Sequence, residues 1–173
     1  MRIVETKVYT FDELSDEAKQ KAIEHWREGY LDYDWWDAVY EDADQCAKIL
    51  GINIDKPLKK CMDGKMRPGG PIIYFSGFSS QGDGASFNGT YAYRKGWRKA
   101  LAEHAPQDKE LLEIGKALQE AQKPARYRLT ARAVNRDRYC HSGCMHIEVD
   151  NGTEEQESII TQCLRDFADW IYK

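Results

Sequence analysis

The chain has 173 residues, with 25 basic and 29 acidic side chains and a formal charge of −4 at pH 7. A chain of this length can bury enough apolar surface to fold as one domain without a disulfide or metal. Its hydrophobic content of 42% excludes general disorder, and its net acidity disfavours non-specific attraction to nucleic acid or anionic lipid.

The sequence also predicts where the protein resides. Its longest apolar run, residues 72–75, is far shorter than the roughly 20 residues of a membrane span, and the N-terminal residues contain no apolar secretory core. The five cysteines are an odd number, which favours reduced thiols. We therefore expect a cytoplasmic protein with no membrane association.

The first fifty residues predict one strand and two helices. Residues 2–11 alternate loosely, as a strand does. Ser15 then caps a helix that ends near Gly29, and a second helix opens after Asp34 and ends at Leu50. The apolar stripe of the first helix is Ala18, Ala22, Ile23, Trp26 and Tyr30, and that of the second is Trp36, Val39, Tyr40, Ala43, Cys46, Ala47 and Leu50.

The middle of the chain predicts an insertion followed by a hairpin. Residues 52–70 lose periodicity and gain Lys, Pro and Gly, which is typical of a mobile insertion. Two strand-like runs follow, at 71–78 and 85–93, and a polar segment separates them. Helices are expected over residues 94–104 and from Pro106 to the residue before Pro124.

The last third of the chain predicts a second hairpin and a final helix. Residues 126–136 alternate cleanly, with Tyr127, Leu129, Ala131 and Ala133 on the inward face, and residues 144–150 do the same. Thr153 and Gln156 form a capping box for the last helix. Together these elements predict an α+β fold: a single domain over residues 1–173, with an antiparallel sheet of about five strands and helices mainly on one face.

The segment "SSQGDG" contains the first candidate site, Ser79, Ser80, Gln81 and Asp83. It lacks the lysine and following helix of a phosphate-binding loop, and it has too few carboxylates for calcium. It fits a tight hairpin turn. Its polar residues between aromatics also fit a loop that makes adaptable contacts to another protein.

A second candidate surface lies in the acidic, aromatic segment from Tyr30 to Gln45. The residues proposed to contact a partner there are Tyr33, Trp35, Asp37, Glu41 and Asp44. The segment is either a solvated acidic helix face or a surface that attracts a basic partner over long range.

A compressed cluster of Cys140, His141, Cys144 and His146 offers an alternative, a metal-dependent or thiol enzyme. Zinc binds Cys and His side chains, but the four residues are so close in sequence that we expect only three of them to reach the same ion. The sequence contains no recognised catalytic motif, so we expect no enzymatic activity, no cofactor and no metal.

An arginine row, Arg126, Arg128, Arg132, Arg136 and Arg138, offers a second alternative. On a strand it could follow a phosphate backbone. Glu148 and Asp150 are expected opposite it, so cross-strand ion pairing is the simpler explanation and nucleic acid is an unlikely partner.

Three segments carry a resemblance: "YTFDELSDEAKQKAIEHWRE", "IYFSGFSSQGDGASFNGTY" and "RYCHSGCMHIEV". Together they resemble a family of tailed-phage and prophage proteins labelled as an antitoxin of a toxin-antitoxin stability system. The resemblance implies a small phage-type accessory protein of the bacterial cytoplasm that binds and neutralises a toxin or host defence component by protein-protein contact. It implies no catalytic residues.

Overall fold

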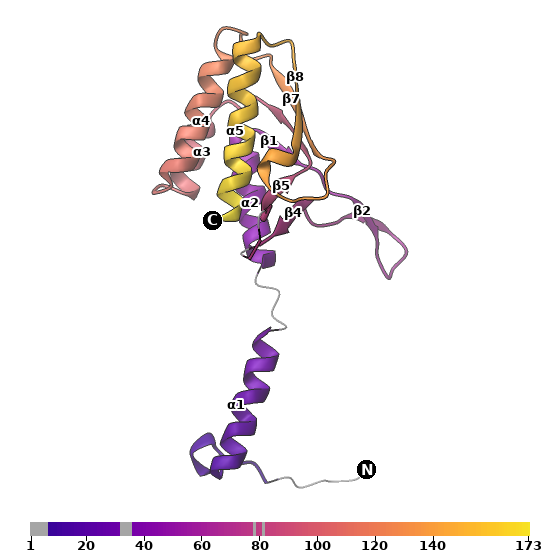
Figure 1. The fold of residues 1–173 in the computed structure, drawn as a ribbon, viewed down its shortest axis with the longest axis vertical. Helices are drawn as coiled ribbons and strands as arrows, with labels where there is room; N and C mark the ends of the chain where they lie inside the picture. Colours follow the sequence, from indigo (N-terminus) through magenta and orange to yellow (C-terminus); the bar gives the residue numbers. More distant parts are fainter. Residues whose placement is uncertain (1–6, 32–35, 78, 81) are drawn as a thin grey trace. The chain divides into compact units, whose positions relative to one another are not determined.

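The computed structural model describes residues 7–31, 36–77, 79–80 and 82–173, without the side chains of residues 28–31. The chain divides into two compact units, residues 1–35 and residues 36–173 (Figure 1). We call the second unit the α+β domain, because it contains the sheet and four of the α-helices. The predicted domain covered residues 1–173, whereas the α+β fold lies within 36–173.

The first unit contains a short 3-10 helix, η1 (Phe11–Glu13), and α1 (Asp16–Leu31). The strand predicted over residues 2–11 is wrong for residues 7–11, because the Thr10 amide donates to Glu13 Oε2 (2.8 Å) and thereby caps η1. Residues 2–6 lie outside the described residues. Helix α1 begins as predicted, with Ser15 Oγ accepting from the Ala18 amide, and it continues two residues beyond Gly29.

The α+β domain is built around an antiparallel sheet of strand order β1-β6-β7-β8. Its strands are β1 (Ile52–Ile54), β6 (Gly89–Ala92), β7 (Thr130–Asn135) and β8 (Met145–Asp150). Two small antiparallel sheets accompany it, β2 (Leu58–Lys60) with β3 (Met66–Pro68), and β4 (Ile73–Ser76) with β5 (Gly84–Phe87). The helices are α2 (Trp36–Leu50), α3 (Trp97–His104), α4 (Lys109–Gln122) and α5 (Glu154–Tyr172), with the 3-10 helix η2 (Ser142–Cys144) before β8. The predicted α+β class is confirmed.

The helices cover one face of the sheet, as predicted. Along β6, Gly89 and Tyr91 are buried while Thr90 and Ala92 are exposed, so one face of this strand meets the core and the other meets solvent. Helix α5 runs across the inner face (Figure 1), where the Phe167 ring meets Phe87 edge-on at 5.7 Å. The predicted capping box starts α5, with the Thr153 amide donating to Gln156 Oε1.

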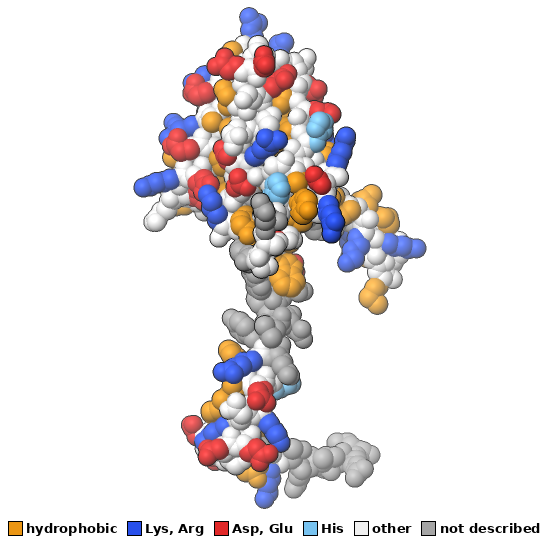
Figure 2. All heavy atoms as spheres, viewed as in Figure 1, with side chains coloured by type: hydrophobic (Ala, Val, Ile, Leu, Met, Phe, Trp, Pro, Cys, Tyr) orange, Lys and Arg blue, Asp and Glu red, His pale blue; other side chains and the backbone are white. Residues whose placement is uncertain are grey.

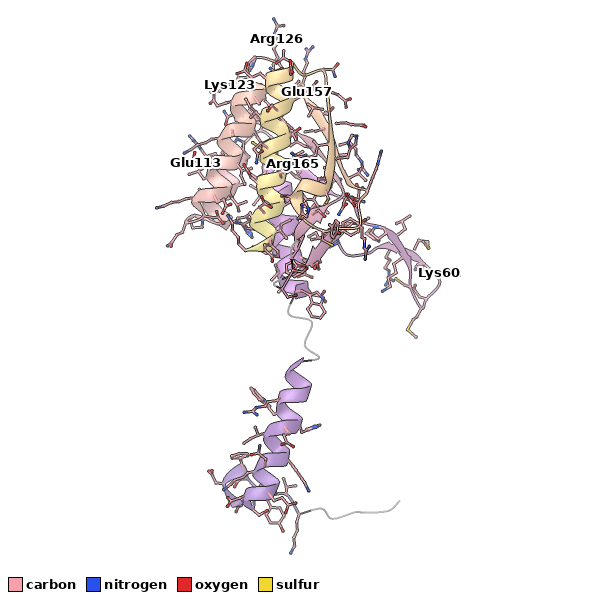
Figure 3. All side chains as sticks on the ribbon, viewed as in Figure 1. Lys60, Glu113, Lys123, Arg126, Glu157 and Arg165 are labelled. Atoms are coloured by element: carbon pink, nitrogen blue, oxygen red, sulfur yellow. The ribbon has the colours of Figure 1, made fainter. Side chains whose placement is uncertain are left out.

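The residues predicted as an insertion have two structural roles. Ile52 and Ile54 are fully buried in β1, so the prediction that periodic structure stops at residue 52 is wrong. Strands β2 and β3 form an exposed hairpin that carries Lys60 (Figure 3). Figure 2 shows basic and hydrophobic side chains together on this hairpin.

The strand predicted over residues 85–93 is two strands of different sheets. It breaks at Asn88, whose Oδ1 accepts from the Asn135 amide (2.8 Å). Strand β5 pairs with β4, and β6 pairs with β1 and β7. The predicted alternation of buried and exposed residues is therefore confirmed for β6. It is wrong for β5, because all four residues of that strand are buried.

The strand predicted from residue 126 begins only at Thr130. Arg126 and Tyr127 have positive φ values of 54° and 61°, and Tyr127 is 43% exposed, so its predicted inward position is wrong. Arg126 lies at the turn after α4 (Figure 3). The buried Gln122 side chain holds this turn, because its Nε2 donates to Leu129 O (2.8 Å) and its Oε1 accepts from the Leu129 amide (3.1 Å).

The core prediction for α2 is correct for its second half only. Ala43, Cys46, Ala47 and Leu50 are buried, whereas Trp36 and Val39 are each 40% exposed. None of the described helices has both the length and the apolar composition that crossing a membrane requires.

Candidate functional site

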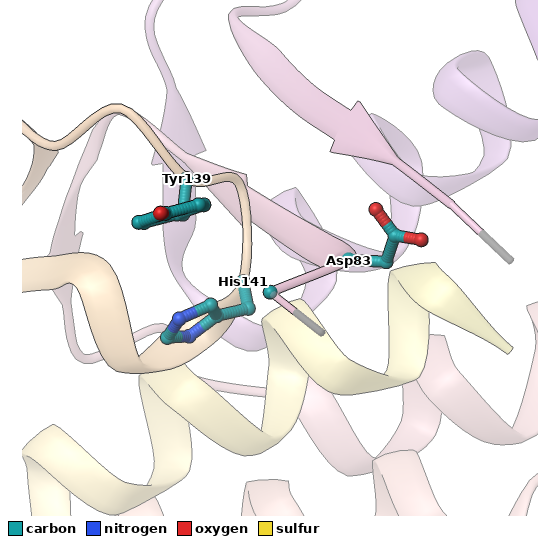
Figure 4. Close-up of a pocket in the computed structure, with 4 residues that line it drawn as sticks. Asp83, Tyr139 and His141 are labelled. Carbon is teal, nitrogen blue, oxygen red and sulfur yellow. The ribbon is translucent and has the colours of Figure 1, made fainter. Parts of the chain in front are cut away.

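Two segments far apart in the sequence meet at one end of the α+β domain. They are the described residues of 77–83, between β4 and β5, and residues 136–144, between β7 and β8; we call them together the polar tip. Gly82, Asp83, Tyr139 and His141 line an open hollow of about 360 Å³ between them (Figure 4). The structure therefore joins the first candidate loop to the Cys/His cluster.

Glycines allow the two segments to approach. A Cβ at Gly84 would lie 2.7 Å from His141 Cα and Cβ, and a Cβ at Gly82 would lie 3.0 Å from the Tyr139 ring. Gly82 also has a φ of +103°, which side-chain-bearing residues rarely adopt. Gly82 and Gly84 are therefore required for the contact with residues 139–141, and Gly82 is also required for the turn.

The Asp83 carboxylate organises the first segment from inside. Its Oδ2 accepts from the amides of Ser79 (2.8 Å) and Ser80 (2.6 Å), and its Oδ1 accepts from the hydroxyls of Ser76 (2.8 Å) and Ser80 (3.0 Å). The amide hydrogen bonds from Ser80 and Ser79, with that from the Ser76 hydroxyl, lower the pKa of Asp83 to about 2. In Figure 4 the carboxylate points away from Tyr139 and His141. Asp83 thus fixes the loop, which explains the serines that a simple turn would not need.

We expect the loop to loosen only in strong acid. Because the folded-state pKa of Asp83 lies below its usual value, the stabilisation is complete above about pH 4 and is lost as the pH falls through about 2. An NMR titration should show the Ser79 and Ser80 amide protons shifting with that midpoint. Asp83→Asn should abolish the transition. A midpoint near the ordinary aspartate value would show that these hydrogen bonds do not form in solution.

Asn135 holds the second segment. Its Nδ2 donates to Ser86 Oγ (2.7 Å) and to Tyr139 O (2.9 Å), and its Oδ1 accepts from the Asp137 amide (2.8 Å). Since Ser86 is fully buried, this link ties the segment to the core. The tip therefore has an internal hydrogen-bond framework on both sides of the hollow.

The framework presents aromatic and polar groups to solvent. The Tyr139 side chain is 51% exposed, and its ring lies nearly parallel to that of His141, with centroids 6.4 Å apart. Ser79 and Ser80 are exposed on the facing loop. Gln81, also predicted to contact a partner, lies outside the described residues.

The four donors of the alternative metal site, Cys140, His141, Cys144 and His146, do not come together among the described residues. Cys144 Sγ lies 3.3 Å from His141 Nε2, but His146 turns to Glu148 (2.9 Å) on the exposed face of β8. The reason is that Cys144 belongs to η2 and β8 begins at Met145, so Cys144 and His146 do not share a strand face. Burial, together with nearby Asp137, raises the pKa of Cys144, which favours a neutral thiol over a nucleophilic thiolate.

The arginine row is not a continuous stripe. Arg132 donates from both terminal nitrogens to the two Asp55 oxygens (3.0 and 2.5 Å). It lies opposite Glu148 in the β7–β8 register, as predicted, but the expected cross-strand ion pair is replaced by the one with Asp55. Arg136 and Arg138 follow the last residue of β7 and are exposed at the polar tip. Arg126 and Arg128 come before the first residue of β7, at the opposite end of the strand. Figure 2 shows acidic and basic side chains interspersed over the visible face of the α+β domain.

The acidic surface on α2 is smaller than predicted. Asp44 is 6% exposed, and its Oδ2 accepts from both Lys48 and Lys56 at 2.6 Å, so its predicted role in partner binding is wrong. Burial alone would raise the pKa of Asp44, but the hydrogen bonds from the two lysines outweigh it and lower the pKa. Asp37 and Glu41 are exposed on α2, whereas Tyr33 and Trp35 lie outside the described residues.

A family model described as a domain of unknown function (DUF8835) matches residues 35–173, which cover the α+β domain. No curated protein and no solved structure matches the chain.

Proposed function

Because the chain belongs to the DUF8835 family, whose description names no activity, we propose from the geometry of the polar tip that it is a non-enzymatic binding protein. In this proposal the tip docks onto a partner protein, and Ser79, Ser80 and Tyr139 supply the contacts. Asp37 and Glu41 on α2 remain further candidate contacts, outside the tip.

The observation that carries the proposal is the internal order of an exposed surface. Asp83 and Asn135 use their own hydrogen bonds to hold two loops on which Ser79, Ser80 and Tyr139 are exposed to solvent. A loop already held in its bound conformation loses less conformational entropy on association, so more of the contact energy appears as affinity. Tyrosine with serine and glycine is also the composition of many protein-binding loops.

The openness of the hollow favours a protein partner over a small substrate. It is a shallow space between loops, and enzyme substrates generally bind in pockets that bury most of their surface. The resemblance to phage accessory proteins favours a toxin or host defence component as the partner, and the bacterial cytoplasm as the place of action.

The two alternatives have less support. A zinc centre at Cys140–His146 would need convergent donors, and His146 instead turns to Glu148. A thiol enzyme there would need a lowered thiol pKa, and burial raises the pKa of Cys144. A nucleic-acid interface along the arginine row would need free guanidinium groups, and Asp55 occupies that of Arg132.

Partner capture from a bacterial lysate, followed by affinity measurement with the purified partner, tests the proposal. Tyr139→Ala should weaken the complex by roughly tenfold or more, as expected for an exposed aromatic at the centre of an interface. Asp83→Ala should also weaken it, because the loop loses its order. Tyr127→Ala is the matched control and should leave the affinity unchanged. Tyr127 is similarly exposed, but it comes before the first residue of β7, whereas the polar tip follows the last.

A photocrosslinking side chain distinguishes direct contact from an indirect effect. Placed at Ser80 it should form a covalent adduct with the captured partner, and placed at Lys99, on the exposed side of α3, it should not. Equal capture by wild type, Tyr139→Ala and Asp83→Ala, with no adduct at position 80, would contradict the proposal.

A further inference from the structure

A second group of reactive side chains lies where the end of α3 meets α2. Asp42 and Cys46 are four residues apart on α2, and His104 is the last residue of α3. Their ligand atoms all lie within 4.8 Å of one another, and His104 Nε2 is 2.8 Å from Asp42 Oδ1. This set of three residues, which we call the Asp-Cys-His cluster, takes no part in the polar tip.

We propose that the Asp-Cys-His cluster binds a Zn²⁺ ion through Asp42, Cys46 and His104. Thiolate sulfur, imidazole nitrogen and carboxylate oxygen are the three donor types that zinc uses in proteins. Mg²⁺ and Ca²⁺ prefer oxygen ligands throughout, so the thiol selects against them. With three protein ligands the fourth tetrahedral position is left for water.

The donor atoms need only small shifts: separations of up to 4.8 Å must shorten, and the 2.8 Å contact between His104 Nε2 and Asp42 Oδ1 must lengthen. Ideal zinc–ligand bonds of about 2.0 to 2.3 Å place neighbouring donor atoms roughly 3.3 to 3.6 Å apart. Cys46 is fully buried and fixes one corner of the site. The side chains of Asp42 and His104 are 57% and 34% exposed, so they have room to rotate toward an ion.

Solvent access and charge are also suitable. Asp42 lines an open hollow of about 440 Å³ with Trp170 and Lys173, so the carboxylate side of the cluster is open to solvent. Lys173, the nearby cation, forms an ion pair with Glu110. A zinc ion bound by one thiolate, one carboxylate and a neutral imidazole gives a site with no net charge, which a half-buried position tolerates far better than an unpaired ion.

The competing explanation is an ordinary surface His–Asp hydrogen bond beside a core cysteine. Calorimetric titration of the full, reduced chain with Zn²⁺ distinguishes the two, and Co²⁺ gives a second readout through thiolate-to-metal charge-transfer absorption. We expect one ion per chain, a higher melting temperature with zinc, and the cobalt band. Removing a group that only hydrogen-bonds to a metal ligand already lowers metal affinity by about 10- to 100-fold. His104→Ala and Asp42→Asn remove ligands themselves, so each should weaken zinc binding by roughly 100-fold or more.

The controls separate this site from the other cysteines. Cys46→Ser should abolish the cobalt band, and Cys163→Ser, at an equally buried thiol on α5, should leave it and the zinc affinity unchanged. Cys144→Ser should also change neither. His104 is partly exposed, so its variant reports on binding even if Cys46→Ser fails to fold. No 1:1 zinc binding, or binding that survives His104→Ala, would overturn the proposal, and neither result bears on the polar tip.

Discussion

Gly51→Ala should destabilise the α+β domain by about 3 kcal/mol or more, from a left-handed backbone cost of about 1 to 2 kcal/mol and a further cost of overpacking. Gly51 has a φ of +86° between α2 and β1. A Cβ there would lie 2.1 Å from the Ala92 carbonyl oxygen. That oxygen belongs to the backbone of β6, directly beside the point where Ile52 of β1 pairs with Tyr91 of β6. The Ala92 amide also donates to Gly51 O (3.0 Å), so the two backbones cannot separate without losing that bond.

Gly64→Ala is the matched control for this prediction. Gly64 also has a positive φ, +77°, but no atom lies within 4 Å of its hypothetical Cβ. Gly64→Ala should therefore cost only the left-handed backbone contribution, about 1 to 2 kcal/mol. Urea unfolding followed by tryptophan fluorescence measures both variants. Equal losses for the two would show that the contact with Ala92 does not control the effect.

Gln122→Leu should destabilise the same domain by about 2 to 4 kcal/mol, because each buried polar group left without a partner costs about 1 to 3 kcal/mol. Gln122 is fully buried and satisfies both the amide and the carbonyl of Leu129. Its Nε2 is also 3.3 Å from the Tyr91 hydroxyl. Leucine fills a similar volume but leaves these groups unpaired at the point where β7 enters the sheet.

Gln162→Leu provides the comparison for Gln122. Gln162 is exposed on α5, and its Nε2 donates to Asp166 in the next turn (2.8 Å). Losing that bond should change the unfolding free energy by less than about 0.5 kcal/mol. If the two variants unfolded at the same urea concentration, the prediction would be wrong. Leucine packing at position 122 would then stabilise the domain as much as the hydrogen bonds of Gln122 do.

The sequence predicted those elements whose pattern repeats over several turns or residues. Helix α5 has a capping box and an apolar stripe, β8 alternates over its six residues and β7 over its first five, so local pattern and tertiary burial agree. Strand β1 has three residues, too few to show a period. Tyr127 fits a strand by its propensity, but the Gln122 hydrogen bonds and the left-handed turn place it outside the sheet.

The candidate sites depended on contacts that local patterns do not contain. The unusual polarity of Ser79, Ser80 and Asp83 was visible in the sequence, and the structure shows that Asp83 holds the loop from within. Nothing in the sequence placed Tyr139 beside Gly82. The pairing of Asp44 with Lys48 follows from helical spacing, but Lys56 reaches it from beyond β1.

The hairpin of β2 and β3 gives the molecule a segment that can vary independently of its core. All six strand residues are exposed, and the Gly69 amide donates to Pro57 O (2.7 Å), so the two ends of the segment lie together. Neither strand pairs with the main sheet. An affinity tag inserted at Gly64 would therefore extend from a closed base, which offers a way to immobilise the protein through a segment that contributes no residue to the polar tip or the Asp-Cys-His cluster.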